Sequence, residues 1–272
     1  MQQITDGVTN LFVHRSTAQR YAAARPYFHP LVAGKIIAFT AIPHFGQAVD
    51  IACGTGQSAR ALASIADQVD AIDTSKEMLA EAEPRDRVRF QLAAAERMPF
   101  TDGSFDLATV GLAFHWFDQA AFLAEACRVL RSGGWLVVYT SGFGGEMAEN
   151  TGFRQWAWDV YPKRFPTPPR RSVGVTAELV EPHGFTLAGK DSFAHDEMMT
   201  ADQLTEYLLT QTNVIASVET GATPLAEAAS WIAAGVGPFF DGKPRTMKFS
   251  GSMWYLRRSD AAARPSITAA SV

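Results

Sequence analysis

Cysteine is scarce in this chain, and the long apolar runs of membrane proteins are missing. The 272 residues include two cysteines, Cys53 and Cys127, and neither belongs to a Cys-x-x-Cys pair. This excludes a disulfide framework and disfavours zinc or redox chemistry. No run of about 18 apolar residues occurs, and the first residues lack the basic and apolar regions of a signal peptide. We therefore expect a cytoplasmic protein with no membrane partner.

An excess of positive charge is also missing. Lys and Arg number 24 against 28 Asp and Glu, a net charge of −4, whereas binding to nucleic-acid phosphates needs clustered excess base. We expect no nucleic-acid partner. The histidines have no ligand-like spacing to each other or to cysteine, so we expect no metal site. The chain also lacks Gly-x-Ser-x-Gly and Gly-Lys-Ser/Thr motifs, which disfavours α/β-hydrolase and P-loop chemistry.

Between about residues 34 and 140, apolar runs typical of buried strands alternate with runs of helical period. We expect strands at 47–52, 69–72, 88–92, 107–110 and 135–140, and helices at 58–66, 77–82 and 119–130. Short buried strands separated by helices predict βαβ units, and therefore a parallel sheet covered on both faces.

After residue 141 the alternation stops. We expect an aromatic helix at about 153–161, a long helical region at about 201–234, and strands at 185–193 and 247–256. The two strands could pair as an antiparallel edge of the sheet, with the helical insert between them in sequence. An insert at that place would cover the C-terminal ends of the strands, where open α/β sheets bind ligands.

A glycine turn joins the first predicted strand to the first predicted helix. Gly54 and Gly56 have no Cβ, so the turn can adopt positive φ and its backbone can approach a ligand closely. Asp73 ends the next strand, where a carboxylate can accept hydrogen bonds from a ribose diol. Together they predict a nucleoside site, and the alternative is a tight turn with a helix cap. Gly54-x-Gly56-x-x-Ala59 also satisfies the dinucleotide fingerprint, so a nicotinamide cofactor stays open.

Several segments then follow in a fixed order: Asp50-x-Ala52-x-Gly54-x-Gly56, Asp73-x-Ser75-x-x-Met78-Leu79, Ala95-Glu96-Arg97-Met98-Pro99-Phe100, Ser104-Phe105-Asp106-Leu107 and Arg128-Val129-Leu130-Arg131-Ser132-Gly133-Gly134-Trp135. In this order they resemble the class I S-adenosylmethionine-dependent methyltransferases, in particular the small-molecule group that includes trans-aconitate and ubiquinone-pathway enzymes. Ala52 stands where that family usually has its first glycine. Upstream, Tyr21-x-x-x-Arg25-Pro26 resembles the family's segment that closes over the cofactor.

The resemblance implies S-adenosylmethionine as the methyl donor and S-adenosylhomocysteine as the product. It also implies a fold class: α/β, a Rossmann-like, doubly wound, mostly parallel seven-stranded sheet with an antiparallel C-terminal edge and a helical lid insert. The residues that it implies for donor binding lie in the N-terminal segment and at the ends of successive strands: Tyr21, Arg25, Asp50, Ala52, Gly54, Gly56, Asp73, Thr74, Met78, Ala95, Glu96, Leu112 and Phe114.

The chain is accordingly divided into four parts. Residues 1–33 are expected to form an N-terminal lid segment that closes over the donor, and residues 34–145 the donor-binding core. Residues 146–258 are expected to supply a substrate lid and the strands that complete the sheet. Residues 259–272, rich in Ala and Ser, read as a flexible tail.

Methyl transfer from a sulfonium depends mainly on collinear positioning in a dry pocket, so few catalytic residues are expected. His115 follows the fourth predicted strand, and imidazole titrates near neutral pH. We take it as the candidate general base, the alternative being a histidine in the pocket wall. With His115, we expect Trp116, Trp156 and Tyr161 to contact the acceptor, the alternative being ordinary core packing.

The sequence therefore predicts an S-adenosylmethionine-dependent methyltransferase that acts on O, N or C of a small molecule, a metabolite or natural product, as a monomer or homodimer. Two alternatives stay open. One is a protein of the same fold that catalyses a biosynthetic step without methyl transfer, since fold does not fix function. The other is a NAD-dependent oxidoreductase.

Overall fold

The computed structural model describes residues 4–5, 8–9, 11–168 and 174–259. Within them a seven-stranded sheet has the order β5-β4-β3-β6-β7-β9-β8. Neighbours from β5 to β7 run parallel, and the pairs β7–β9 and β8–β9 are antiparallel. The predicted fold class is confirmed. The strands are β3 (Phe45–Ile51), β4 (Ala66–Asp73), β5 (Val88–Leu92), β6 (Phe105–Gly111), β7 (Leu130–Met147), β8 (Phe185–Met199) and β9 (Arg245–Arg258). A separate antiparallel pair joins β1 (Ile4–Thr5) to β2 (Val8–Thr9).

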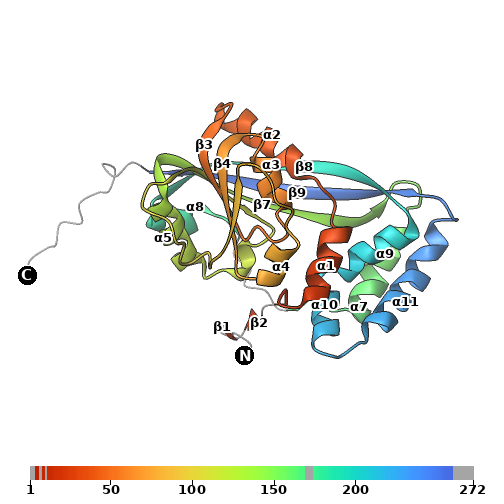
Figure 1. The fold of residues 1–272 in the computed structure, drawn as a ribbon. Coiled ribbons are helices and arrows are strands. Elements are labelled where there is room, and N and C mark those ends of the chain that lie inside the picture. Colours follow the sequence, from red (N-terminus) through yellow and green to blue (C-terminus); the bar gives the residue numbers. More distant parts are fainter. Residues whose placement is uncertain (1–3, 6–7, 10, 169–173, 260–272) are drawn as a thin grey trace, which may run out of the picture.

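Helices cover both faces of the parallel strands (Figure 1). On one face, α2 (His29–Thr40) and α3 (Gln57–Leu62) bury Ile36 and Leu62 against the sheet. On the other, α5 (Gln119–Val129) and α8 (Ala177–Val180) bury Phe122 and Val180. The short helix α4 (Lys76–Ala80) follows β4. Because both faces are covered, the central strands β3 and β6 are buried over most of their length. The edge strand β5 instead alternates apolar and polar residues.

The antiparallel strands extend well beyond the parallel part of the sheet (Figure 1). A third core forms beneath this extension, where Phe249 of β9 and Met147 of β7 meet helices from two parts of the chain. These helices are α6 (Phe153–Gln155), α7 (Tyr161–Arg164), α9 (Ala201–Leu209), α10 (Thr212–Glu219) and α11 (Leu225–Val236). Helix α1 (Arg15–Ala24) packs against α9. We call α6, α7, α9, α10 and α11 the lid helices. The antiparallel pairing of the two late strands, with helices between them in sequence, is confirmed.

Three expected helices are wrong in extent. The helix expected at 58–66 ends at Leu62, and Ala66 already belongs to β4. The region at 201–234 is three helices, because α9 ends at Leu209 and Pro224, which has no backbone N–H, caps the start of α11. The helix at 153–161 is interrupted by a π turn over Trp156–Val160. Short 3₁₀ turns occur at Phe114–Trp116, Glu181–His183 and Gly237–Phe239. The division placed after residue 33 lies inside α2, which is continuous across it.

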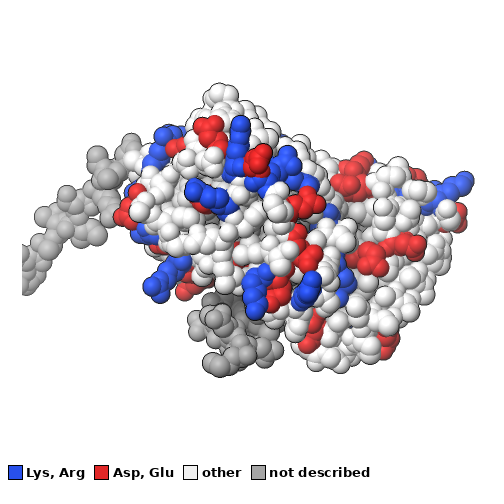
Figure 2. Space-filling view, viewed as in Figure 1, with Lys and Arg blue, Asp and Glu red and all other residues white. Residues whose placement is uncertain are grey.

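Of the predicted tail, Ser259 alone lies within the described residues, and its backbone N–H donates to the Gly184 carbonyl at 2.9 Å. Acidic and basic side chains are interspersed over the face drawn in Figure 2, with no continuous basic surface on that face. In the part of the chain that the structure describes, no helix combines the length and apolar character needed to cross a membrane.

Candidate functional site

The loop between β3 and α3 has three residues in the left-handed region. Ala52, Gly54 and Gly56 have φ of 56°, 55° and 79°. A Cβ on Gly56 would lie 2.8 Å from Phe90 Cζ, so a side chain is excluded there by space as well as by backbone conformation. The positive φ of Gly54 and Gly56 agrees with the turn that the glycine spacing predicts. We call this loop the cradle, and its contact with a ligand stays a prediction.

Asp73 holds that loop to the end of β4. Its Oδ2 accepts a hydrogen bond from the Gly54 N–H at 2.8 Å, and its Oδ1 accepts one from the Ser75 N–H at 2.8 Å. Burial raises the pKa of the Asp73 carboxyl above its usual value. Each carboxylate oxygen has a further lone pair, so Asp73 can accept two ligand hydroxyl groups without giving up these contacts.

Asp50 supports the loop from within the core. It is fully buried and accepts hydrogen bonds from the hydroxyls of Ser58 and Thr109, the latter at 2.8 Å. Burial raises the pKa of Asp50 to about 7, against the opposing effect of these two hydrogen bonds. Asp50 therefore joins β3, α3 and β6, and supports the cradle from within.

A cavity lies at the carboxyl ends of β3 and β6, beneath the N-terminal segment. Of the predicted donor-binding residues, Tyr21, Arg25, Ala52, Gly54 and Leu112 line it. The lining also includes residues that sequence reasoning did not select: Phe28, His29, Ser141, Tyr207 and Phe249. They belong to segments that are far apart along the chain, and no local motif marks them.

His29 is the most unusual of these residues. Its Nδ1 lies 2.9 Å from the Tyr139 hydroxyl. Burial, followed by the positive charge of Arg60, lowers the pKa of His29 to about 3. Burial likewise raises the pKa of Tyr139 well above its usual value. His29 and Tyr139 are therefore an uncharged hydrogen-bonded pair at neutral pH.

Arg25 has the one buried donor on the cavity lining that lacks a partner among the described residues. Its Nη2 donates to the Thr210 carbonyl at 2.6 Å, and its guanidinium lies over the rings of Tyr21 and Tyr207. Its Nε is buried without a hydrogen-bond acceptor. Buried guanidinium donors are rarely left unpaired, so this group fits a carboxylate ligand.

Other predicted donor-binding residues lie around the loop rather than on the cavity wall. Met78 is buried beneath Gly54. The Thr74 backbone N–H donates a hydrogen bond to the Asp73 carboxylate. Ala95 is part of the core, and Glu96 accepts a hydrogen bond from the Asp118 N–H at 3.1 Å.

The predicted aromatic contacts lie apart from the cavity. Phe114 is buried against Phe117 and Phe122. Trp156 and Tyr161 belong to the core beneath the sheet extension, where the Tyr161 hydroxyl donates to Asn213 at 3.3 Å. In this structure they stabilise the lid helices.

His115 and Trp116 lie in the 3₁₀ turn after β6, with ring centroids 4.7 Å apart. Among the described residues that line the cavity, neither is present. Their roles in catalysis and acceptor binding therefore stay predictions.

Comparisons with known proteins agree with this geometry. Residues 49–138 match the family model described as a methyltransferase domain. A demethylmenaquinone methyltransferase of Beutenbergia cavernae is 40% identical over 94 residues, which cover 34% of this chain and 39% of that protein. For three other curated relatives, the matched segments span 36%, 36% and 51% of the relative's own length.

Solved structures match over more of the chain. The structure of a proposed type II methyltransferase from Anaeromyxobacter dehalogenans aligns with a TM-score of 0.64 at 26% identity, covering 86% of this chain and 97% of that one. The (4+2)-cyclase SpnF aligns with a TM-score of 0.52 at 18% identity, covering 85% and 81%. The second likeness shows the fold alone.

Proposed function

We propose that the chain transfers a methyl group from S-adenosylmethionine to a small molecule, because residues 49–138 match the model of a methyltransferase domain. When bound, this donor supplies an electrophilic methyl group on a positively charged sulfur. The observation that carries the proposal is the contact of Asp73 with the Gly54 N–H at the edge of a cavity. It places a carboxylate and bare backbone side by side, which is the arrangement that binds a ribose.

The donor's parts are assigned to separate residues. Asp73 accepts the ribose hydroxyls, and the segment with Ala95 and Glu96 lies beside adenine. Arg25 binds the carboxylate of the methionine moiety through its unpaired Nε. The N-terminal segment and the lid helices then exclude water from the reacting groups, which strengthens electrostatic interactions within the cavity.

The acceptor is a small molecule that binds between the glycine loop and the aromatic wall of Phe28, Tyr207 and Phe249. Pockets for small ligands have such apolar walls with a few polar groups. Because positioning supplies most of the rate in this chemistry, the wall residues contribute by fixing the acceptor in line with the methyl group.

Calorimetric titration with S-adenosylmethionine, S-adenosylhomocysteine and NAD tests the proposal. We expect the first two to bind and NAD not to bind. Asp73→Ala should weaken donor binding by about 1–3 kcal/mol, the cost of leaving ligand hydroxyls unpaired. Asp67→Ala, at an exposed residue paired with His44, is the matched control and should leave affinity unchanged. A preference for NAD, or equal affinities of the two variants, would contradict the proposal.

The general-base role of His115 is tested by His115→Ala. If His115 takes a proton from the acceptor, turnover falls by about 10²–10⁴-fold while donor affinity is kept. An unchanged rate would show that His115 is not the general base and has a structural role only.

A second function, a biosynthetic step without methyl transfer, stays open, because the cyclase SpnF shares this fold and fold does not fix function. It predicts that the donor binds and is recovered intact after turnover. Chromatography of the donor pool separates the two functions, since methyl transfer converts one S-adenosylmethionine to S-adenosylhomocysteine for each product formed.

A further inference from the structure

Three polar side chains form a line that begins at the cavity wall. The Ser141 hydroxyl of β7, which lines the cavity, lies 3.4 Å from His195 Nε2 of β8. On the other side of the same imidazole, His195 Nδ1 lies 3.0 Å from Glu197 Oε1. The order is hydroxyl, imidazole, carboxylate, and the hydroxyl is the member exposed to a ligand.

The sheet places these residues together although β9 separates their strands. His195 and Glu197 are two residues apart on β8, so their side chains share one face. Ser141 pairs with Gly251 of β9, and Gly251 pairs with Phe193. Because Gly251 carries no side chain, nothing on β9 stands between Ser141 and its diagonal neighbour His195.

Two phenyl rings hold the imidazole in plane. The His195 ring lies between Phe28 at 5.2 Å and Phe249 at 5.0 Å, with interplanar angles of 17° and 19°. Its side chain is 12% exposed. Stacking on both faces restricts the ring to one orientation, in which each nitrogen faces its own partner.

The charged and titratable groups around His195 allow it to take a proton. Glu197 faces it from β8, and His29 faces it from α2. The residues stacked against it from β9 and from the segment before α2 are uncharged phenylalanines. His29 is hydrogen-bonded to a phenol and is kept neutral by burial. Of the two imidazoles, only His195 has a carboxylate to stabilise an imidazolium.

We propose that Ser141, His195 and Glu197 form a proton relay, and that the acceptor of methyl transfer is a phenol or another neutral hydroxyl compound. This inference rests on the proposed function. No carboxylate occurs among the described residues on the cavity lining, so an ammonium acceptor would lack a charge partner. A neutral hydroxyl has no charge to pair, but it must lose its proton when its oxygen is methylated.

A lone pair of the acceptor oxygen forms the new C–O bond, the C–S bond breaks, and its electron pair stays on sulfur, which becomes a neutral thioether. The acceptor proton passes to Ser141 Oγ while the Ser141 proton passes to His195 Nε2. The imidazolium is stabilised by Glu197 and releases its proton to water after the product leaves. Ser141 touches the acceptor, whereas His195 and Glu197 act through it.

The long distance between Ser141 and His195 is consistent with this role, because catalytic hydrogen bonds are often long until substrate is bound. Acyl transfer by Ser141 is a poorer fit. Such chemistry needs free backbone N–H groups that stabilise an oxyanion, and Ser141 lies within the paired part of β7.

The tautomer of His195 tests the relay without any acceptor. We would record the ring ¹⁵N shifts of histidine-labelled protein, both alone and with S-adenosylhomocysteine. The relay requires a proton on Nδ1, facing Glu197, and a lone pair on Nε2, facing Ser141. Ser141→Ala should move the Nε2 shift and Glu197→Gln the Nδ1 shift. Ser192→Ala, at an exposed hydroxyl of the same strand, should move neither. The opposite tautomer in the unmodified protein would overturn the proposal.

A kinetic arm uses methyl-labelled donor with a phenol, an aliphatic alcohol, a primary amine and an enolisable diketone. We expect the hydroxyl compounds to be methylated. Ser141→Ala and His195→Gln should each lower kcat by about 10²–10⁴-fold with little change in KM or in donor affinity. Glu197→Gln should lower kcat by a smaller factor, and Glu197→Asp should have a higher kcat than Glu197→Gln.

The two proposals fail separately. If the unmodified protein does not bind donor, the methyltransferase function fails while the tautomer result stands by itself. If donor binds and a hydroxyl compound is methylated equally well by the Ser141→Ala variant, the relay fails alone. If only the amine or the diketone is methylated, the substrate class is wrong. If none of the four compounds reacts, the ¹⁵N shifts alone decide whether the relay is present. Thermal melting of each variant identifies any that does not fold.

Discussion

At the scale of single residues, Ala52 adopts a backbone conformation that favours glycine. Its φ is 56°, and an L-residue in that region costs roughly 1–2 kcal/mol. We expect Ala52→Gly to raise the free energy of unfolding by about 1 kcal/mol in urea denaturation. Ala63, which has φ of −61° at the end of α3, is the control, because glycine there should lower stability by roughly 0.5–1 kcal/mol. Equal effects at both positions would show that Ala52 is not strained.

Two buried titratable residues act on stability in opposite directions with pH. The pKa of Asp50 is raised to about 7, so its contribution is present at low pH and is lost as pH rises from about 4 to 7. The pKa of His29 is lowered to about 3, so its contribution is lost as pH falls from 6.5 to 3. Between pH 4 and 6.5 the two largely cancel.

Single substitutions should expose each contribution. In Asp50→Asn, the free energy of unfolding should rise with pH more steeply than in the unmodified protein, by about 1 kcal/mol per pH unit between pH 4 and 6.5. In His29→Gln, the free energy of unfolding should fall with pH relative to that of the unmodified protein, with a slope of similar size. Urea denaturation at pH 4.5, 5.5 and 6.5 measures both slopes. Variants that keep the original slope would show that these groups titrate normally in the folded state.

At the scale of elements, Arg128 of α5 holds the loop that follows Ala95 and Glu96. Its guanidinium donates to the carbonyls of Phe100 at 2.7 Å and Met98 at 3.0 Å, and it pairs with Glu125. These contacts need the planar fork of arginine. The helix α5 therefore fixes the loop in addition to the loop's own hydrogen bonds, such as that from the Ser104 hydroxyl to the Thr101 carbonyl.

Arg128→Lys should loosen this loop. We expect a loss of about 1–2 kcal/mol in the free energy of unfolding, from the missing charged hydrogen bonds. Hydrogen exchange over residues 96–103 should speed up, and calorimetry should show weaker donor binding. Arg131→Lys, at an exposed residue paired with Asp106, is the matched control. If both variants exchange alike, α5 does not position the loop.

The sequence predicts elements well where their signals are local. The strand expected at 69–72 lies within β4, and the strand expected at 88–92 coincides with β5. Apolar residues mark both segments, in β5 by alternation with polar residues. The strand expected at 135–140 is longer in the structure, because β7 continues through Ser141 to Met147. That continuation is polar and rich in glycine. It is kept extended by pairing with β9, which starts about a hundred residues later.

The same limit applies to the candidate site. Gly54 and Asp73 were found because a turn and a strand end can be recognised from their neighbours in sequence. Ser141, His195 and Phe249 come from three strands that meet only in the folded sheet. No pattern within any one of these segments identifies them. The half of the cavity proposed to bind the donor is therefore predictable, whereas the half proposed for the acceptor depends on long-range pairing.

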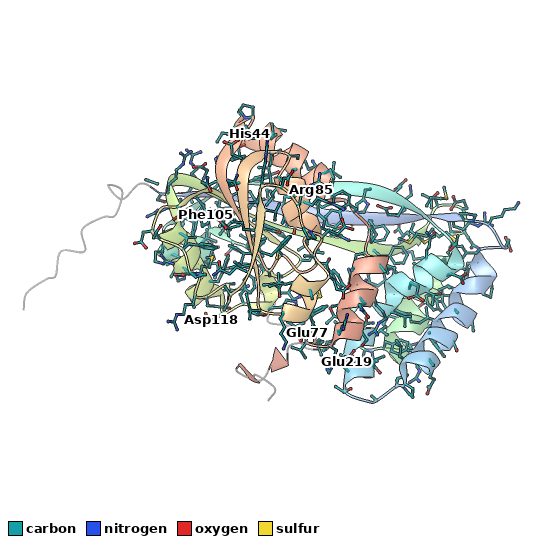
Figure 3. The ribbon with its side chains drawn as sticks, in the orientation of Figure 1. His44, Glu77, Arg85, Phe105, Asp118 and Glu219 are labelled. Carbon is teal, nitrogen blue, oxygen red and sulfur yellow. The ribbon has the colours of Figure 1, made fainter. Side chains whose placement is uncertain are left out.

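At the scale of the whole molecule, Glu219 of α10 joins the N-terminal segment to the lid helices. It accepts a hydrogen bond from the Thr17 hydroxyl and pairs with Arg20 at 3.4 Å and His14 at 3.3 Å. In Figure 3, Glu219 lies beside the N-terminal end of α1, where the lid helices meet that helix. Tyr21 and Arg25, which line the cavity, follow on the same segment. Glu219 thus connects lid docking to donor binding.

Glu219→Ala should release α1 from the lid. We expect faster hydrogen exchange over residues 15–24 and weaker donor binding, by about 1–2 kcal/mol, because ordering of α1 must then be supplied by the donor. The parallel strands make few contacts with α1, so their exchange should be unchanged. Glu227→Ala removes an exposed ion pair with Arg164 on the same lid, and such pairs contribute little. If that control weakens donor binding as much, lid docking depends on the lid helices as a whole and not on the Glu219 contacts.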